Sequence, residues 1–211
     1  MGERVAVVAV VLAAGAGSRF RGDTHKLLAP FRGRPVVGWA LEHALAAGLD
    51  RTWVVTGAVD LVAAGVVPAG VEVLVNDRWA EGQATSLHVA VAAASAAGGA
   101  GGAGGAIDSI VAGLGDQPLV SPEAWQAVAA STGRPIGVAI YRGRRANPVR
   151  LDRECWDLLP REGDEGARVV FRERPDLVME VPCVSDPTDI DTVDDLRSAG
   201  DGPLGLNGQF V

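Results

Sequence analysis

Val8 to Lys26 reads VAVVLAAGAGSRFRGDTHK, an apolar run that ends in a turn of small residues and is followed by the cations Arg19 and Lys26. A strand cannot stay extended through Ala-Ala-Gly-Ala-Gly. We therefore expect the chain to turn here and to expose backbone N–H groups at the carboxyl end of the strand. Backbone donors and nearby cations suit a phosphate group, so the stretch predicts a strand followed by a phosphate-binding turn.

Two familiar phosphate loops do not match this turn. A dinucleotide-binding fingerprint would need a third glycine where Phe20 stands, and a P-loop would need Gly-Lys-Ser/Thr, whereas Lys26 lies between His25 and Leu27. Lys26 is also the only lysine in the chain, against 18 arginines. A lysine ammonium approaches phosphate as a point charge, which arginine reproduces poorly. We therefore interpret Lys26 as a phosphate ligand rather than a surface lysine.

Composition favours one globular domain over residues 1–211, because 48% of the 211 residues are hydrophobic and suffice for a full core. The net charge of −7 leaves no basic surface for nucleic acid or an anionic membrane. The two cysteines and three histidines have no spacing that suits zinc. We expect a reduced, cytoplasmic protein without a structural metal.

The N-terminal apolar run has a second interpretation, because Arg4 followed by apolar and then small residues resembles a secretory signal. The run is too short to cross a membrane. Its richness in valine and the bounding glycine are typical of a buried parallel strand, so we predict the first strand at Val5–Leu12.

Apolar β-branched runs alternate with Ala- and Leu-rich helical patterns along the whole chain, which indicates βαβ units. We predict an α/β fold of three layers, with a mostly parallel central sheet and helices on both faces. The predicted strands are 5–12, 52–56, 71–75, 107–114, 138–141 and 177–181. The predicted helices are 35–47, 61–65, 85–97, 122–131, 165–174 and 192–198.

Two Gly-rich segments are predicted to be flexible or poorly ordered. Residues 98–106, GGAGGAGGA, contain no cation or hydroxyl, and we expect a flexible surface insertion there. Residues 201–211 are expected to form a poorly ordered tail.

Carboxylates follow two parts of the predicted fold. Asp116 comes just after the apolar strand 107–114, at the end of a strand where ligands bind in open α/β sheets. Asp189 and Asp191 are two residues apart, so an extended backbone would place both on one face. Mg²⁺ needs only one or two carboxylates besides water and phosphate. Turn formation and helix capping are the structural alternatives for these acids.

Two polar loops complete the candidate residues. Residues 76–86, NDRWAEGQATS, join a strand to a helix; their amides and hydroxyls suit a nucleobase edge, and Gly82 would let a ligand approach the backbone closely. Residues 163–168, GDEGAR, open a predicted helix whose N–H groups, together with Arg168, suit an anion. Capping of that helix by Asp164 is the structural alternative.

Taken together and in this order, the motifs resemble the MobA-like nucleotidyltransferase family and, within it, the MocA type of molybdenum cofactor cytidylyltransferase. The segments that carry the resemblance span nearly the whole chain: LAAG at 12–15 with Arg19 and Lys26, NDRWAEGQATSL at 76–87, LGDQPLVSP at 114–122, GDEGAR at 163–168 and DIDTVDDL at 189–196. The resemblance implies a Rossmann-like nucleotidyltransferase fold. It also implies Mg²⁺-dependent transfer of CMP from CTP to the phosphate of molybdopterin, with release of pyrophosphate; the LAAG turn is similar to the cytidine-preferring form.

The resemblance further implies roles for individual residues. The implied nucleotide-binding residues are Leu12, Ala13, Ala14, Gly15, Arg19, Lys26, Asn76, Gly82, Gln83 and Ser86. The implied acceptor-binding residues are Asn147, Asp164, Gly166 and Arg168. Arg19, Lys26 and Asp116 would be catalytic, and Asp116 with Asp191 would hold Mg²⁺, Asp189 being the alternative second ligand.

Other acceptors and other reactions stay open at this point. A sugar phosphate or methylerythritol phosphate would be used by the same chemistry. A redox protein similar to nicotine blue oxidoreductase would need a nicotinamide cofactor, and a chaperone that only binds and delivers the molybdenum cofactor would not need Asp116 for activity. We expect a small-molecule acceptor, with a molybdoenzyme or its chaperone as a candidate partner, and neither nucleic acid nor membrane.

Overall fold

The centre of the molecule is a seven-stranded sheet with the order β5-β4-β1-β6-β8-β7-β9. The computed structural model describes residues 6–97 and 106–200. The strands are β1 (Ala6–Ala13), β4 (Arg51–Thr56), β5 (Val71–Val75), β6 (Ile107–Leu114), β7 (Ile136–Tyr141), β8 (Arg144–Asp152) and β9 (Val178–Pro182). β8 is antiparallel to β6 and β7, and the other pairs are parallel. The prediction of a mostly parallel sheet is confirmed.

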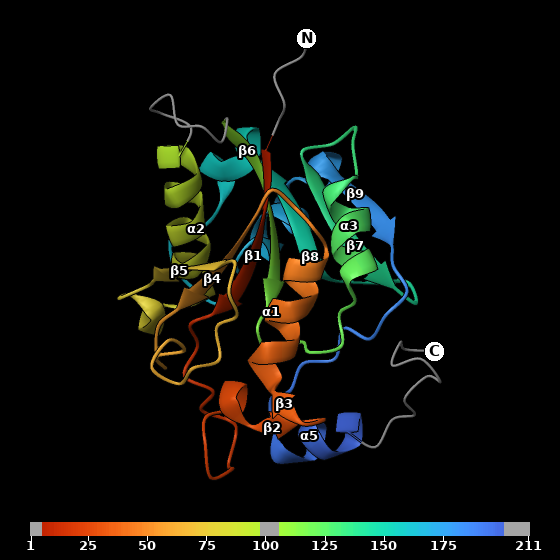
Figure 1. Cartoon of the computed structure of the whole chain (residues 1–211). Helices are drawn as coiled ribbons and strands as arrows, with labels where there is room; N and C mark the ends of the chain where they lie inside the picture. Colours follow the sequence, from red (N-terminus) through yellow and green to blue (C-terminus); the bar gives the residue numbers. More distant parts are fainter. Residues whose placement is uncertain (1–5, 98–105, 201–211) are drawn as a thin grey trace.

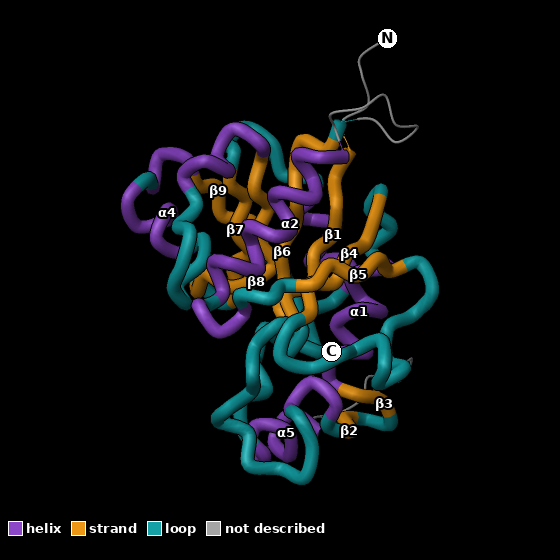
Figure 2. Tube along the Cα trace, turned by 90° about the vertical axis from the view of Figure 1, so that its left-hand side faces the viewer, coloured by secondary structure: helices purple, strands orange, loops and turns teal. Residues whose placement is uncertain are grey.

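Helices cover both faces of the sheet and make three layers (Figure 1). The α-helices are α1 (Val36–Ala46), α2 (Gln83–Ala97), α3 (Pro122–Ala129), α4 (Arg168–Glu173) and α5 (Val193–Gly200). α1 and α3 pack on one face, and α2 and α4 pack on the other. α5 lies beyond the lower end of the sheet, beside the small hairpin of β2 (Pro30–Phe31) and β3 (Arg34–Pro35) (Figure 2). Short 3-10 helices span Lys26–Leu28, Trp79–Glu81, Arg153–Leu158 and Pro175–Leu177.

β1 is a central strand buried on both faces, as its valine-rich sequence predicts. Its side chains alternate between the two cores, because successive residues of a strand point to opposite faces. Val8, Val10 and Leu12 pack on the side of α2, whereas Val11 and Ala13 pack on the side of α1 and α3. The turn that follows β1 is therefore anchored in the middle of the sheet edge.

The predicted helix at 61–65 is wrong, because these residues form a single hydrogen-bonded turn. The Asp60 carboxylate accepts from the N–H groups of Val62 and Ala63, which starts a helical turn. Gly65 then adopts a left-handed conformation with φ of +67°. A glycine at positive φ ends a helix, so the turn stops before a second one forms.

β8 is a strand that the sequence analysis missed. Its first half is polar and rich in arginine, which hides the strand pattern; Arg144 and Arg145 are exposed, whereas Val149 to Leu151 are buried. It is inserted between β6 and β7 and pairs with both. An exposed end and a buried end in one strand do not produce a regular alternation of polar and apolar residues.

Two helix starts differ from prediction by two residues or more. α2 begins at Gln83, two residues before the predicted start, and the Thr85 hydroxyl donates to the Gly82 carbonyl instead of capping. α4 begins at Arg168, and no side chain caps it, so Asp164 is not its cap. In both places a polar loop runs directly into the helix. Residues of these two loops line the candidate site described below.

Three expectations fall outside the described residues: the first residue of the predicted strand 5–12, the insertion over 98–105, and the tail 201–211. No helix within 6–97 and 106–200 is long and apolar enough to cross a bilayer.

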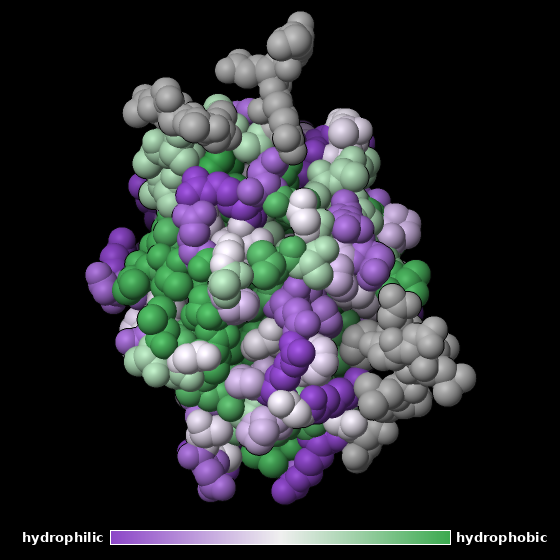
Figure 3. Space-filling view, viewed as in Figure 1, coloured by the Kyte–Doolittle hydropathy of each residue, from purple (hydrophilic) through white to green (hydrophobic). Residues whose placement is uncertain are grey.

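Figure 3 shows hydrophobic side chains gathered on the side of the molecule that carries β4 and β5. Val75, the last residue of β5, and Val62, in the connection between β4 and β5, are 62% and 59% exposed.

Candidate active site

The turn after β1 is held at both ends by backbone hydrogen bonds. The Leu12 carbonyl accepts from Gly115 N (2.9 Å), and the Ala14 carbonyl accepts from Ala58 N (3.0 Å). Gly17 adopts φ of +61°, which turns the chain toward Arg19. These bonds fix the turn to the loops that follow β6 and β4, so it lines the carboxyl edge of the sheet in one conformation.

Lys26 brings two distant carboxylates together at this edge. Its Nζ lies 2.6 Å from Asp116 Oδ2 and 2.8 Å from Asp191 Oδ1. Arg19 Nη1 lies 3.0 Å from Asp191 Oδ2. The structure thus gathers four of the residues predicted for catalysis and metal binding into one cluster of two cations and two anions.

The Lys26 ammonium is charged in this cluster. Burial alone would lower its pKa, but the charges and hydrogen bonds of Asp116 and Asp191 outweigh burial and raise the pKa above its ordinary value. The side chain of Lys26 is only 11% exposed, so the charge is concentrated at one point in the cleft. A fixed, dehydrated ammonium is a strong partner for a phosphate oxygen.

The carboxylates fit a divalent cation. Asp116 Oδ2 accepts from Lys26, whereas its Oδ1 is buried and has no hydrogen-bond partner within the described residues. Asp191 Oδ1 accepts a hydrogen bond from the same Lys26 ammonium. No group of three or more His, Cys, Asp or Glu side chains in these parts of the chain is placed to hold a metal. A cation here would therefore need water and substrate phosphates as its remaining ligands, which is the habit of Mg²⁺.

Asp191 is free for this cluster because Thr192 caps α5. Thr192 Oγ1 accepts from Asp195 N (3.1 Å), and Asp195 Oδ2 accepts from Thr192 N (2.8 Å), which is a reciprocal capping box. The alternative in which Asp191 itself caps the helix is thus not the one the structure adopts. Asp189 lines the same cleft.

The pKa of Asp189 is raised to about 6, because the surrounding protein reduces its hydration and because Asp116 and Asp191 repel its charge. A carboxyl group with a raised pKa in the folded state destabilises the fold where it is ionised. The free energy of unfolding therefore falls as the pH rises from 3.8, the ordinary pKa of an Asp carboxyl group, through about 6, the pKa of Asp189 in the folded protein.

We expect Asp189→Asn to raise the free energy of unfolding by about 1 kcal/mol near pH ~7.5 and by little near pH ~4. The figure is well below the full linkage value because the side chain is exposed to solvent in the open cleft. Urea unfolding at the two pH values measures the difference. An equal gain at both would contradict the assigned electrostatic cause.

The segment 76–86 contributes Trp79, Ala80, Gly82, Gln83 and Ser86 to the lining of the cleft. It is also joined to the 163–168 loop. Gly163 N donates to the Glu81 carbonyl and Ala84 N donates to the Gly163 carbonyl, each at 3.0 Å. Gly82 has φ of +109°, and a Cβ on it would collide with the Gly163 backbone. Its lack of a side chain therefore admits the neighbouring loop, while Gly82 itself still lines the cleft.

Two predicted nucleotide-binding residues lie behind the cleft and do not line it. Asn76 is only 2% exposed; its Nδ2 donates to Thr85 Oγ1 (2.8 Å) and Ser86 Oγ (2.9 Å). Ala13 is buried in the core beside α1. Asn76 thus orients Ser86, which does line the cleft, and direct contact of either residue with a ligand is not supported by their position.

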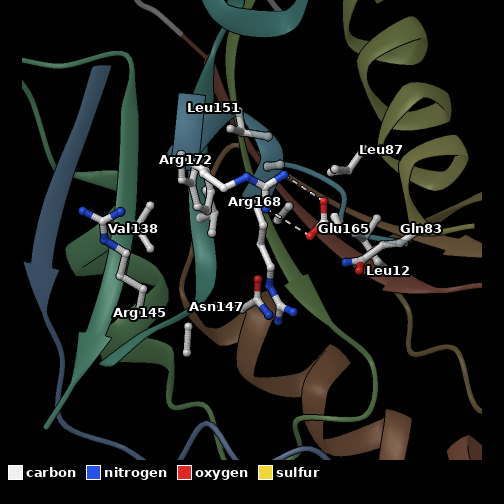
Figure 4. Close-up of a pocket in the computed structure, with 15 residues that line it drawn as sticks. Leu12, Gln83, Leu87, Val138, Arg145, Asn147, Leu151, Glu165, Arg168 and Arg172 are labelled. Atoms are coloured by element: carbon white, nitrogen blue, oxygen red, sulfur yellow. Dashed lines mark hydrogen bonds and ion pairs between the residues drawn. The ribbon is translucent and has the colours of Figure 1, made fainter. Parts of the chain in front are cut away.

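A cavity at the carboxyl edge of the sheet adjoins a second one that lies over the face covered by α2 and α4. The larger, of about 610 Å³, is charged; among the predicted residues it is lined by Leu12, Ala14, Gly15, Arg19, Lys26, Gly82, Gln83, Ser86, Asp116, Asp164, Arg168 and Asp191. The smaller, of about 280 Å³, has an apolar floor that includes Leu87, Val138, Val149, Leu151 and Phe171 (Figure 4). Leu12, Gln83 and Arg168 line both.

The smaller cavity contains the predicted Asn147, Glu165 of the predicted loop 163–168, and two polar residues that sequence reasoning missed, Arg145 and Arg172. In Figure 4 Arg168 extends across the cavity toward Asn147, and Arg172 turns to Glu165. Gly166 packs against Leu87 and against Gln83, which lines both cavities; a Cβ on Gly166 would lie 3.4 Å from Leu87 Cδ1. The four-residue spacing of Arg168 and Arg172 was the available signal, because it places both on one face of a helix.

The comparisons with known proteins agree with this architecture. Residues 9–178 match the family model of the MobA-like NTP transferase domain. The chain belongs to the MobA-like NTP transferase family. Nicotine blue oxidoreductase of Paenarthrobacter nicotinovorans is 32% identical over 204 residues, which cover 90% of the chain and 94% of that protein.

Two solved structures extend the agreement. A nucleotidyl transferase from Methanothermobacter thermautotroptrophicus is 26% identical with a TM-score of 0.73, over 93% of this chain and 96% of that one. Rv0371c from Mycobacterium tuberculosis H37Rv, in complex with manganese, is 28% identical with a TM-score of 0.73, over 94% of this chain and 100% of that one. The family and these neighbours identify this MobA-like protein as a nucleotidyltransferase and confirm the resemblance and the fold class.

Proposed function

We propose that this MobA-like transferase moves CMP from CTP to the terminal phosphate of molybdopterin, with Mg²⁺ as its metal. The observation that carries the proposal is the pair of adjoining cavities, which share Leu12, Gln83 and Arg168. The charged cavity suits a triphosphate and a cation. The cavity with the apolar floor suits the flat ring system of a pterin, and an acceptor phosphate would lie at the shared boundary.

The charged cavity explains how the triphosphate would be held. Arg19, Lys26 and the N–H groups of the turn from Ala14 to Gly17 would bind its oxygens. Asp116 and Asp191 would hold Mg²⁺, which, when bound, neutralises phosphate charge and orients the α-phosphate. Lys26 and Arg19 already lie against these two carboxylates, so the groups that bind phosphate and the groups that bind the cation are contiguous.

Transfer needs no nucleophile from the protein. An oxygen of the acceptor phosphate attacks the α-phosphorus of CTP in line, the bond to the β-phosphate oxygen breaks, and pyrophosphate leaves. Arg19 and Lys26 would stabilise the charge that develops on the leaving group. Arg168, at the boundary of the two cavities, would hold the attacking phosphate next to the α-phosphorus.

A pyrophosphate-release assay tests the proposal. Purified protein is given CTP, GTP or ATP, each with molybdopterin, a sugar phosphate or methylerythritol phosphate, with and without Mg²⁺. We expect release with CTP and molybdopterin and dependence on the metal. Release with a different pair would reassign the substrates within the same chemistry, and no release with any pair would overturn the proposal.

We also propose that the protein acts in the cytoplasm and delivers its product to a molybdoenzyme or to the chaperone of one.

Arg168→Met is expected to lower kcat/KM for the acceptor by about 100-fold, because it removes the cation that would hold the attacking phosphate next to the α-phosphorus. No ion pair within the described residues neutralises Arg168, whereas both guanidinium nitrogens Nη1 and Nη2 of Arg172 lie 3.1 Å from Glu165 oxygens. Arg172→Met, one turn further along α4, is the matched control and should cost less than about fivefold. A loss in Arg168→Met that appears only in the KM for CTP would contradict the assigned contact with the acceptor.

A second candidate is supported by the similarity to nicotine blue oxidoreductase, which extends over 94% of that protein. Such an activity would reduce a quinoid dye with a nicotinamide cofactor. The turn after β1 lacks the third glycine of the dinucleotide fingerprint, Phe20 standing in its place, which favours the transferase. Consumption of NADPH with a quinoid dye, measured beside the pyrophosphate assay, separates the two.

A further inference from the structure

His25 lies between the phosphate-binding turn and Lys26 and contacts both segments. Its ring Nε2 is 3.1 Å from the Gly15 carbonyl oxygen. Its ring Nδ1 accepts a hydrogen bond from Leu27 N at 3.3 Å, so the side chain caps the 3-10 helix Lys26–Leu28. One imidazole thus connects the middle of the turn to the helix whose first residue is the cleft lysine.

The two partners determine the tautomer of His25. The Leu27 N–H only donates, so Nδ1 must carry no hydrogen; the Gly15 carbonyl only accepts, so Nε2 must carry one. Only the neutral imidazole with hydrogen on Nε2 satisfies both. Burial lowers the pKa of His25 below its ordinary 6.5, the Gly15 carbonyl opposes this shift, and the Lys26 charge adds to it. The neutral form therefore predominates at neutral pH.

The turn and the Lys26 side chain are in contact beside this ring. A Cβ on Gly17 would lie 3.0 Å from Lys26 Cγ and 3.2 Å from His25 Nε2. The groups that face the ring are the backbone of Gly15, Ala16 and Gly17 on the turn, and Leu27 and Lys26 on its own helix. Lys26 is the charged group in the described part of the chain that acts on it.

We propose that neutral His25 is a positioning residue, which holds the β1 turn and Lys26 in register so that both reach the same triphosphate. The inference rests on the proposed nucleotidyl transfer, since it concerns that site. Protonation would put an N–H on Nδ1 opposite the Leu27 N–H, two donors facing each other, and would break the cap. Nucleotide binding is therefore expected to weaken as the pH falls below the ordinary histidine value of 6.5.

The tautomer can be measured without any substrate. Long-range ¹H–¹⁵N correlation spectra resolve the ring nitrogens, and the chain contains only three histidines to assign. We expect His25 as the Nε2–H tautomer with a titration midpoint below 6.5. A Nδ1–H tautomer, or a midpoint above that value, would overturn the inference even if the protein transfers CMP. If the protein binds no CTP, the proposed substrate fails while the spectra still decide the tautomer.

Two variants separate the cap from the contact with the turn. His25→Asn keeps an acceptor for Leu27 N but is too short to reach Gly15, whereas His25→Ala loses both bonds. We expect the KM for CTP to rise about tenfold in His25→Asn and further in His25→Ala, with kcat within about threefold. His88→Asn is the matched control, because it removes a similar contact, from Nε2 to the Pro160 carbonyl at 3.0 Å, away from the turn. A larger effect on kcat than on KM in His25→Asn would contradict a positioning role.

The pH dependence of CTP binding distinguishes a positioning role of His25 from a purely structural one, which would not change the shape of the pH profile. Binding of CTP with Mg²⁺ is measured by calorimetry between about pH 5.5 and 8 in wild type and in His25→Asn. Asp189, with a pKa of about 6, and the triphosphate itself also titrate in this range, so the difference between the two profiles is diagnostic. We expect the wild type to lose affinity more steeply on the acid side. Identical profiles would overturn the inference.

Discussion

Asp116→Asn is expected to lower kcat/KM for nucleotidyl transfer by about 10³-fold, which corresponds to the several kcal/mol that a bound metal ion supplies. Asparagine keeps the size of the side chain but not its charge. In the wild type Lys26 Nζ lies 2.6 Å from Oδ2, so the variant removes one of the two anionic partners of Lys26. It also makes a poorer cation ligand of the position that Oδ1 occupies, where the wild-type oxygen is buried without a hydrogen-bond partner. A steady-state pyrophosphate assay with CTP and the acceptor measures the loss.

Metal binding provides a second readout for Asp116. Binding of Mn²⁺ in the presence of CTP should weaken in parallel with activity, because the same carboxylate is assigned to both. Asp108→Asn is the matched control, since Asp108 lies on the same strand β6 but pairs with Arg153 (3.4 Å) and is 41% exposed. It should retain wild-type activity. An Asp116→Asn protein with full activity would contradict the role assigned to Asp116.

Lys26→Met is expected to lower kcat/KM by about 10²–10³-fold, through loss of a buried ammonium at the developing phosphate charge. Lys26→Arg is expected to restore only part of this activity. The ammonium places one nitrogen within 2.8 Å of both carboxylates while its side chain is 11% exposed, and a planar guanidinium needs more room. Arg21→Met is a matched control in the same segment, because Arg21 is exposed. Full activity in Lys26→Arg would show that charge alone suffices.

The position of Lys26 has a consequence for metal binding. Its ammonium lies between the two carboxylates assigned to Mg²⁺, so it competes with a cation for the same oxygens. Without nucleotide, Lys26→Met should therefore bind Mn²⁺ at least as tightly as the wild type, although it binds CTP less well. Weaker Mn²⁺ binding in this variant would mean that Lys26 organises the carboxylates rather than competing for them.

Much of the fold followed from local patterns. The valine-rich run before the small-residue turn predicted a buried strand, and β1 is a buried central strand. The position of Asp116 after an apolar strand placed it at the edge of the sheet where Lys26 meets it. These predictions succeeded because hydrophobic periodicity and turn chemistry act over a few residues.

The contacts that complete the candidate site follow from no local pattern. β8 enters the sheet antiparallel, although its arginines hide its strand character. Gly82 is a glycine because the Gly163 backbone lies against it, and Asn76 faces Ser86 rather than the cleft.

The sequence by itself determined most of the strands and helices, in their order along the chain, and the residue types that follow each strand, because these depend on near neighbours. Only the tertiary structure decided that Lys26 meets Asp116 and Asp191, which lie 90 and 165 residues away, and that two cavities share Arg168. Strand order and sheet register bring such distant groups together. That arrangement is set by the packing of the whole core, so no single stretch of the chain specifies it.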